Sequence, residues 1–199
     1  MISLRSLALV AVTSLALAAC GRGSSTVALE LTDAPVTLSA VEKIEISFGK
    51  VEVESGHSCG GGDKDGARAG RERGGEWTTV NENAGTFDLL SLRDGVTAPL
   101  GEVEVWGEVQ AIRLQIDAAG TNQVIMKDGT VCALDTTGVT EASLRIAEGA
   151  EALSLERGGR TTIVVDFIAE ESIEEVSACN FKLAPVLAIK SVTHADDDA

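Results

Sequence analysis

The sequence contains no tyrosine and only two histidines, and aromatic residues make up 3% of its 199 residues. This shortage argues against acid–base catalysis, because histidine and tyrosine supply many general acids and bases in enzymes. His57 lies in a glycine-rich stretch and His194 lies near the C-terminus, so we expect neither to be held as a catalytic base. The G-x-S-x-G, P-loop and H-E-x-x-H motifs are absent as well. The sequence therefore predicts a protein that is not an enzyme.

Positive charge is also scarce. The chain has 16 Lys and Arg residues against 31 Asp and Glu residues, which gives a formal net charge of −15 at pH 7. A chain this acidic repels nucleic acid and anionic lipid headgroups. We therefore expect no nucleic-acid partner, and we expect the acidity to serve solubility.

The one long hydrophobic run lies at the N-terminus. Leu7 to Leu17 form an apolar stretch of about eleven residues, which is shorter than the roughly 20 residues that a membrane-spanning helix needs. Arg5 precedes this run and small residues follow it, as in a secretory signal. We therefore predict that residues 1–19 are a signal peptide.

The run ends in Leu17-Ala18-Ala19-Cys20, which resembles the lipobox of bacterial lipoproteins. The resemblance implies cleavage before Cys20, acylation of Cys20 and stable anchoring of an exported protein in the cell envelope. Gly21, in place of aspartate, favours the outer membrane where two membranes are present. Residues 20–26 are rich in glycine and serine and are expected to form a flexible tether. The alternative is a secreted protein in which Cys20 occurs by chance.

Beyond the tether the hydrophobic residues alternate with a period of two, which indicates β-strands. The parity of this alternation changes between Phe48 and Val51, so we expect a bulge or bend at Gly49-Lys50. With so few aromatic residues, the core is expected to consist mainly of valine, isoleucine and leucine. The pattern predicts an all-β fold, a single antiparallel β-sandwich of about eight or nine strands over residues 27–192.

Turn signals divide this domain at several points. Two pairs of turn residues between apolar runs predict hairpins. Two short segments have helical character, and one proline interrupts the last predicted strand, where it suits an edge or a bulge. In order, these are the hairpin turns Asp128-Gly129 and Gly158-Gly159, the helical turns 89–94 and 169–176, and Pro185 within the strand 181–192.

Two segments lack any apolar period. Residues 55–76 are rich in glycine and in charges of both signs, which predicts a mobile loop inserted between two strands. Residues 193–199 are short and acidic, and we expect a disordered tail from His194 onward.

With Cys20 acylated, three cysteines remain in an oxidising compartment. Cys132 and Cys179 share strand parity with apolar neighbours, so we expect both to face the core and to form a disulfide. Cys59 is then left free in the 55–76 loop. The competing pairing joins Cys59 to one of the other two and ties the loop down.

Several aspartates suggest a site for a hard cation such as calcium. Asp33 and Asp117 each follow a predicted strand, and Asp63 and Asp65 lie in a D-x-D-G segment that resembles part of a calcium loop. The competing interpretation makes that segment a solvated loop and Asp33 a turn residue that caps backbone amides. Asp166 is expected on the outer face of a strand or paired with Arg113 across the sheet.

Exposed aromatic side chains are the usual stacking platforms for sugars, and this chain has two tryptophans. Trp77 directly follows the 55–76 loop and is the better candidate for ligand stacking, ahead of Trp106.

Six short motifs follow one another along the chain. They are Leu31-Thr32-Asp33-Ala34-Pro35, Phe87-Asp88-Leu89-Leu90-Ser91-Leu92, Ile112-Arg113-Leu114, Lys127-Asp128-Gly129-Thr130, Val165-Asp166-Phe167 and Lys182-Leu183-Ala184-Pro185-Val186. In this order they resemble a family of domains of unknown function that is common in prokaryotic surface lipoproteins and opens with L-T-D-A-P. The resemblance implies one β-sandwich domain on an exported protein, with no established activity. This chain differs at Ile168, where the family usually has a second acidic residue, and at Ala184.

These features together predict a membrane-anchored surface lipoprotein whose β-sandwich is a non-enzymatic binding or envelope-structural module. Its ligand would be a protein or a glycan that the sequence does not identify. The alternative is a calcium-dependent or carbohydrate-binding module. A hydrolase that uses two of the carboxylates of Asp33, Asp88, Asp117 and Asp166 is the remaining enzymatic hypothesis.

Overall fold

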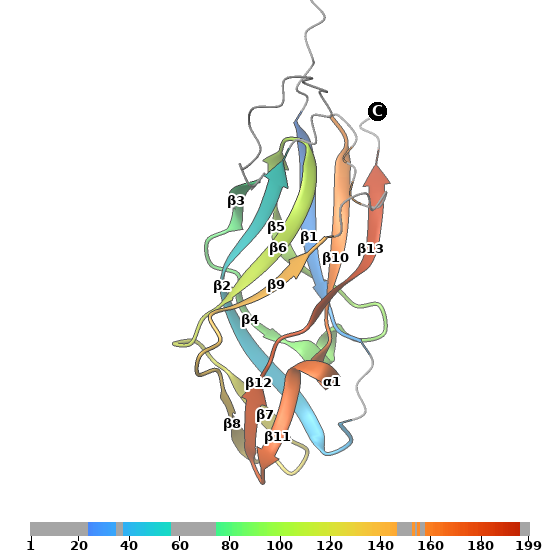
Figure 1. The fold of residues 1–199 in the computed structure, drawn as a ribbon. Helices are drawn as coiled ribbons and strands as arrows, with labels where there is room; N and C mark the ends of the chain where they lie inside the picture. The colour runs from blue at the N-terminus through green and yellow to red at the C-terminus, as the bar shows by residue number, and fades with distance from the viewer. Residues whose placement is uncertain are drawn as a thin grey trace, which may run out of the picture.

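The computed structural model describes residues 24–34, 38–56, 75–146, 153, 155 and 158–195. These residues form two β-sheets that pack face to face (Figure 1). The smaller sheet consists of β1 (Ser25–Thr32), β5 (Ala98–Val105), β10 (Arg160–Phe167) and β13 (Leu187–Ala195). The larger sheet consists of β2 (Val41–Gly56), β3 (Glu76–Asn81), β4 (Gly85–Asp88), β6 (Glu108–Ile116), β7 (Gln123–Met126), β8 (Val131–Asp135), β9 (Glu141–Arg145), β11 (Ile173–Ser177) and β12 (Asn180–Leu183).

The all-β sandwich predicted from the sequence is confirmed. The structure adds strands to the predicted number and mixes their directions, because β1 pairs in parallel with β10 and β12 pairs in parallel with β8. The smaller sheet has the order β13-β10-β1-β5, which places the parallel pair at its centre. In the larger sheet, β7, β8, β11 and β12 extend the molecule downward past the smaller sheet (Figure 1).

The long strand β2 runs through the larger sheet and carries the predicted bulge. Its register against β6 shifts between Phe48 and Val51, so the apolar side chains on both sides of Gly49-Lys50 point into the core. Phe48 lies at the centre of that core, with its ring centroid 5.8 Å from that of Phe87 and 5.9 Å from that of Phe167 on β10. The bulge therefore lets β2 direct apolar side chains into the core on both sides of Gly49-Lys50.

Of the two predicted hairpins, one is confirmed and one is wrong. β7 and β8 pair across Asp128-Gly129, where Gly129 has φ +84°. Gly158-Gly159 does not turn a hairpin, because the partners of β10 are β1 and β13. Instead, the Gly158 N–H donates to the Ser24 carbonyl at 3.0 Å, so this glycine pair joins the starts of β10 and β1.

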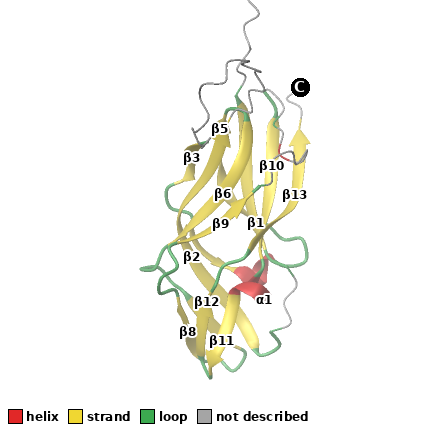
Figure 2. Cartoon of the chain, viewed as in Figure 1, coloured by secondary structure: helices red, strands yellow, loops and turns green. Residues whose placement is uncertain are grey.

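The two helical elements whose residues are all described are single turns (Figure 2). The 3₁₀ turn η1 (Leu89–Leu92) forms within the predicted segment 89–94. The helix α1 (Ala169–Ser172) is shorter than the predicted 169–176, since the chain becomes strand β11 at Ile173. Among the described residues, no helix is long and apolar enough to cross a membrane.

The single last strand predicted over 181–192 is wrong, because Pro185 separates two strands. β12 ends at Leu183 in the larger sheet, and β13 begins at Leu187 in the smaller sheet. Proline has no N–H to donate to a ladder, which suits a segment that crosses between sheets. β13 also continues to Ala195, so the predicted tail is too long: His194 lies in the strand, with its Nδ1 3.0 Å from Thr161 Oγ1.

Other predicted features lie partly or wholly outside the described residues. These are the signal peptide 1–19, Cys20, the loop residues 57–74 with Cys59, and residues 196–199. β1 begins at Ser25, within the predicted tether 20–26.

The Cys132–Cys179 disulfide is present and joins β8 to the turn between β11 and β12, with a Cα–Cα distance of 4.8 Å. Cys132 is buried as predicted. Cys179 is exposed rather than core-facing, because it lies in the turn with φ +59°, where strand parity no longer decides the direction of a side chain. The bond therefore secures the outer edge of the larger sheet.

We expect the Cys132→Ala/Cys179→Ala double variant to lose about 2–4 kcal/mol of unfolding free energy, because the bond constrains a long loop in the unfolded chain. Urea unfolding of the oxidised wild type and of the variant measures this loss. Cys59→Ala is the matched control and should unfold like the wild type. A non-reducing peptide map that links Cys59 to either of the other two cysteines would contradict the pairing.

Candidate functional site

Two aspartates come together where the parallel strands β1 and β10 end. Thr32 on β1 is the register partner of Asp166 on β10, and Asp33 directly follows Thr32. Asp33 is 3% exposed and Asp166 is 6% exposed. Asp166 alternates with the core residues Val165 and Phe167, so it lies on the outer face of the smaller sheet, as one of the two predictions for it stated.

Each carboxylate has one oxygen with a partner and one without. The Ala169 N–H donates to Asp33 Oδ1 at 3.0 Å, and Lys190 Nζ lies 3.9 Å from Asp166 Oδ2. Asp33 Oδ2 and Asp166 Oδ1 are buried and have no hydrogen-bond partner. Among the described residues these are the two buried side-chain oxygens left in this condition, and they belong to neighbouring groups.

Burial changes the protonation of this pair. The pKa of Asp33 is raised to about 6, mainly by desolvation and also by the charge of Asp166, while the Ala169 N–H opposes the change. Desolvation also raises the pKa of Asp166, against the opposing charge of Lys190. The Ala34 N–H lowers the pKa of both carboxyls, which places both close to the same backbone amide.

A recess of about 240 Å³ opens beside Asp33. Lys190 reaches it from β13, where it is the unpaired residue of a bulge, since Val164 pairs with Ser191 and Val165 pairs with Ile189. The lining consists of Thr32, Asp33, Asp94, Gly95, Thr97, Val164, Lys190 and Ser191. Hydroxyls and charges of both signs therefore surround the opening.

Of the other aspartates proposed from the sequence, the two that the structure describes each support a turn. Asp88 caps η1, with its Oδ1 accepting from the Leu90 N–H at 3.2 Å. Asp117 is exposed in the turn after β6 and accepts from the Ala119 N–H at 3.0 Å. Asp63 and Asp65 lie outside the described residues. In the described part of the chain, no three His, Cys, Asp or Glu side chains gather into a group that could hold a metal ion.

Asp33 does more than cap a local turn, which was the competing prediction. Its carboxylate accepts from the Ala169 N–H, 136 residues further along the chain, and the adjacent Ala34 N–H also lowers its pKa. Asp166 is not paired with Arg113, because that arginine lies in the larger sheet and binds Glu52. The sequence placed Asp33 and Asp166 among four candidate carboxylates but did not predict that these two are neighbours. Their proximity depends on the parallel register of β1 and β10, and neither segment alone indicates that register.

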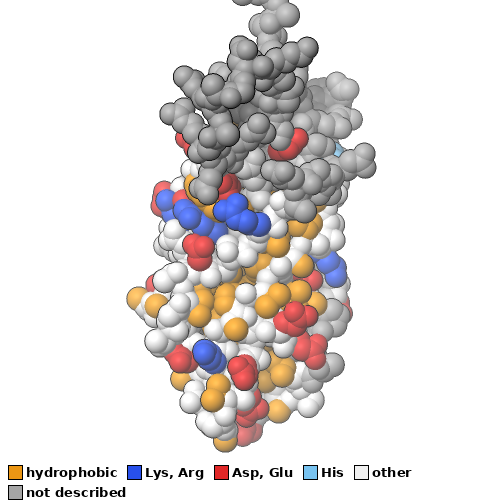
Figure 3. Space-filling view, viewed as in Figure 1, with side chains coloured by type: hydrophobic (Ala, Val, Ile, Leu, Met, Phe, Trp, Pro, Cys, Tyr) orange, Lys and Arg blue, Asp and Glu red, His pale blue; other side chains and the backbone are white. Residues whose placement is uncertain are grey.

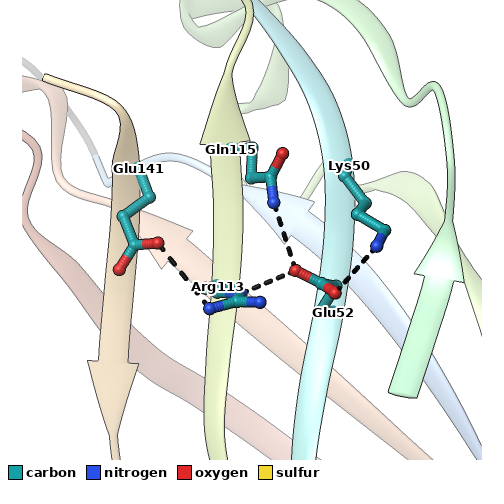
Figure 4. A network of polar contacts seen from close by, with 5 residues as sticks. All are labelled: Lys50, Glu52, Arg113, Gln115 and Glu141. Carbon is teal, nitrogen blue, oxygen red and sulfur yellow. Dashed lines mark hydrogen bonds and ion pairs between the residues drawn. The ribbon is translucent and has the colours of Figure 1, made fainter. Parts of the chain in front are cut away.

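A second group of charges lies on the outer face of the larger sheet (Figure 4). Glu52 on β2 is buried and accepts from Arg113 Nε at 2.6 Å, while Lys50 Nζ lies 3.1 Å from its other oxygen. Gln115 Nε2 donates to Glu52 at 3.2 Å, and Arg113 Nη1 lies 4.0 Å from a Glu141 oxygen. Burial raises the pKa of Glu52, but the hydrogen bonds from Arg113 and Lys50 outweigh it and hold that pKa below its usual value.

Trp77 packs against this charge group. The Arg113 guanidinium carbon lies 4.1 Å from the centre of the Trp77 ring, in cation–π geometry. One face of the ring is therefore covered by the arginine and is not open to a sugar. Trp106 is 46% exposed and lines a recess of about 410 Å³ together with Glu76, Thr78 and Glu104. Trp106 is thus the more accessible aromatic side chain.

We expect Asp33→Asn to change how stability depends on pH. A folded-state pKa near 6 against 3.8 means that the folded chain holds a proton that the unfolded chain releases, so stability falls as the pH rises through this interval. The loss is on the order of 3 kcal/mol in the wild type. It should be smaller in Asp33→Asn, whose amide can accept from Ala169 and donate to Asp166, and where Asp166 alone keeps a raised pKa. Urea unfolding in EDTA across this range measures it, with Asp117→Asn as the control. Parallel curves for the wild type and Asp33→Asn would refute the assignment.

We expect Arg113→Leu to cost on the order of 2–3 kcal/mol of unfolding free energy, because it strands the buried Glu52 carboxylate and removes the cation over Trp77. Arg113→Leu combined with Glu52→Gln should recover part of the loss. Arg145→Ala is the control: that side chain is 78% exposed and pairs with Glu54 at 3.3 Å, so its loss should cost under about 1 kcal/mol. Equal costs for the two arginines would contradict this ranking.

The sequence matches the family described as Domain of unknown function (DUF4382) over residues 24–185. The match includes β1 to β12 with Asp33 and Asp166, and it ends before β13, which carries Lys190. A comparison with curated proteins finds no match. The match covers most of the chain and agrees with the resemblance inferred from its motifs, and the chain therefore belongs to this domain-of-unknown-function family.

Proposed function

We propose that this protein is an exported lipoprotein, anchored through Cys20, whose sandwich is a non-enzymatic module that binds a ligand or supports the cell envelope. The observation that carries the proposal is the lipobox-like Leu17-Ala18-Ala19-Cys20 just ahead of β1. Gly21 to Ser24 alone separate Cys20 from the first strand residue, Ser25. At full extension this connection spans roughly 18 Å, so the anchor would hold the domain close to the membrane.

The short connection also sets an orientation. β1 begins at the same end of the smaller sheet at which β5 ends, since Ser25 pairs with Val105. The recess containing Trp106 directly follows β5 and would therefore face the membrane. The Asp33–Asp166 pair lies at the opposite end of β1, away from the anchor.

The overall charge favours attachment through the lipid. The full sequence has a formal net charge of −15, which disfavours binding of the protein surface as a whole to an anionic bilayer, so the lipid would supply the attachment. On the face in Figure 3, most Lys and Arg side chains lie in the upper part, toward the end at which β1 begins, and acidic side chains are spread from there to the lower end.

The non-enzymatic assignment draws on the carboxylate geometry. A two-carboxylate hydrolase needs both groups open to substrate and water. Of the four aspartates considered for such chemistry, Asp88 and Asp117 support turns, and the unpartnered oxygens of Asp33 and Asp166 are buried. This arrangement favours a structural or binding role for the pair.

We expect Cys20→Ser to release the protein from the membrane fraction and to abolish labelling by radioactive palmitate in the native host. Cys59→Ser is the matched control, because it makes the same change at a cysteine outside the lipobox, and it should remain anchored and labelled. Membrane association that persists in Cys20→Ser would exclude anchoring at this residue.

A further inference from the structure

We propose that Asp33 and Asp166 form a binding site for a hard divalent cation, with calcium as the fitting ion. The two unpartnered oxygens, Asp33 Oδ2 and Asp166 Oδ1, are its protein ligands. The remaining ligands are waters and backbone or hydroxyl oxygens next to the recess beside Asp33.

The burial of both groups carries this inference. Both residues are more than nine-tenths buried, yet each keeps one oxygen with no donor. An unsatisfied buried acceptor destabilises the folded state, and it does so more when it is charged. Two such acceptors on neighbouring carboxylates also repel each other. A single cation between them satisfies both oxygens and removes the repulsion.

The positive side chains close to the pair do not do this. The Lys190 side chain is 58% exposed, and its Nζ lies 3.9 Å from Asp166 Oδ2. The oxygen without a partner is the other one, Asp166 Oδ1. Arg93 lowers the pKa of Asp33 through its charge, but its Nε donates to the Leu90 carbonyl at 2.7 Å. Asp94, which also lines the recess, adds negative charge. Neither positive side chain therefore compensates the unpartnered oxygens of Asp33 and Asp166.

The donor set selects the kind of ion. Apart from the Lys190 ammonium, the polar side chains that line the recess carry carboxylate or hydroxyl oxygens, and none is a histidine or cysteine, which favours calcium or magnesium over transition metals. Calcium tolerates irregular geometry and a mixture of protein and water oxygens, whereas magnesium demands near-ideal octahedral coordination. Since the described residues supply only two acidic ligands, we expect weak binding, with a dissociation constant of roughly 10⁻⁴–10⁻³ M.

The surrounding structure explains why such a site stabilises the fold. Asp33 Oδ1 already connects the end of β1 to the start of α1 through Ala169. Thr32 Oγ1 lies 2.8 Å from the Leu92 carbonyl and connects the same strand end to η1. A cation held by Asp33 and Asp166 adds β10 to these connections, so it stabilises the folded state by mass action.

The test is calcium titration of the full chain after treatment with EDTA, followed by thermal unfolding and calorimetry. Millimolar calcium should raise the midpoint of unfolding by several degrees, and sodium chloride at equal ionic strength should not. Asp33→Asn and Asp166→Asn should each weaken calcium binding at least tenfold. Asp117→Asn, which removes an exposed carboxylate elsewhere, should leave it unchanged.

A second variant keeps the test decisive if an aspartate variant fails to fold. Lys190→Gln removes the positive charge that competes with the ion from an exposed side chain, so it should strengthen calcium binding several-fold. No stabilisation of the wild type by calcium would overturn the proposal, as would weaker binding in Lys190→Gln or loss of binding in Asp117→Asn. None of these results depends on acylation of Cys20, so they leave the proposed anchoring to its own test.

Discussion

The parallel pairing of β1 with β10 at the centre of the smaller sheet determines what both ends of the sandwich contain. Two parallel strands begin at the same end of a sheet and finish at the same opposite end, so Ser24 and Gly158 meet where β1 and β10 start. For the same reason Asp33 and Asp166 meet where the strands finish. An antiparallel partner would have placed Asp166 beside the start of β1, roughly 25 Å from Asp33. The carboxylate pair is thus a consequence of strand direction.

Among the described residues, Glu52 on β2 and Asp33 after β1 are both buried, and they differ in how their charge is compensated. Glu52 is surrounded by side-chain donors: Arg113, Lys50 and Gln115 all reach it at 3.2 Å or less, and its pKa falls. The hydrogen-bond donors to Asp33 are backbone N–H groups, its neighbour Asp166 carries a like charge, and its pKa rises. A buried carboxylate with a full set of partners is a structural ion pair. A buried pair that lacks them stores free energy that a proton or a cation can release.

Local sequence signals predicted local structure well. The change of parity at Gly49-Lys50 lies within one strand and predicted the bulge that is observed there. Asp128-Gly129 lies within one turn and predicted the hairpin of β7 and β8. Predictions failed where contacts between segments far apart in the sequence determine the structure. Gly158-Gly159 resembles a hairpin turn, but its partner is the start of β1. Pro185 resembles a strand defect, but it marks the crossing between sheets. Cys179 paired as predicted although its direction was wrong, because a disulfide depends on Cα separation more than on strand parity.

The proposed anchor and the proposed cation site are linked through a single strand. Cys20 is connected to Ser25 at one end of β1, and Asp33 follows the other end, so the strand itself, roughly 26 Å long, separates them. In this proposed arrangement the recess of Trp106 would face the membrane, while the carboxylate pair would lie at the far end of β1, where calcium from the medium could reach it. A cation at the far end of β1 stabilises the same strand through which any force on the lipid anchor enters the domain. Anchoring and cation binding therefore act on one element, which gives an envelope module a physical reason to have both.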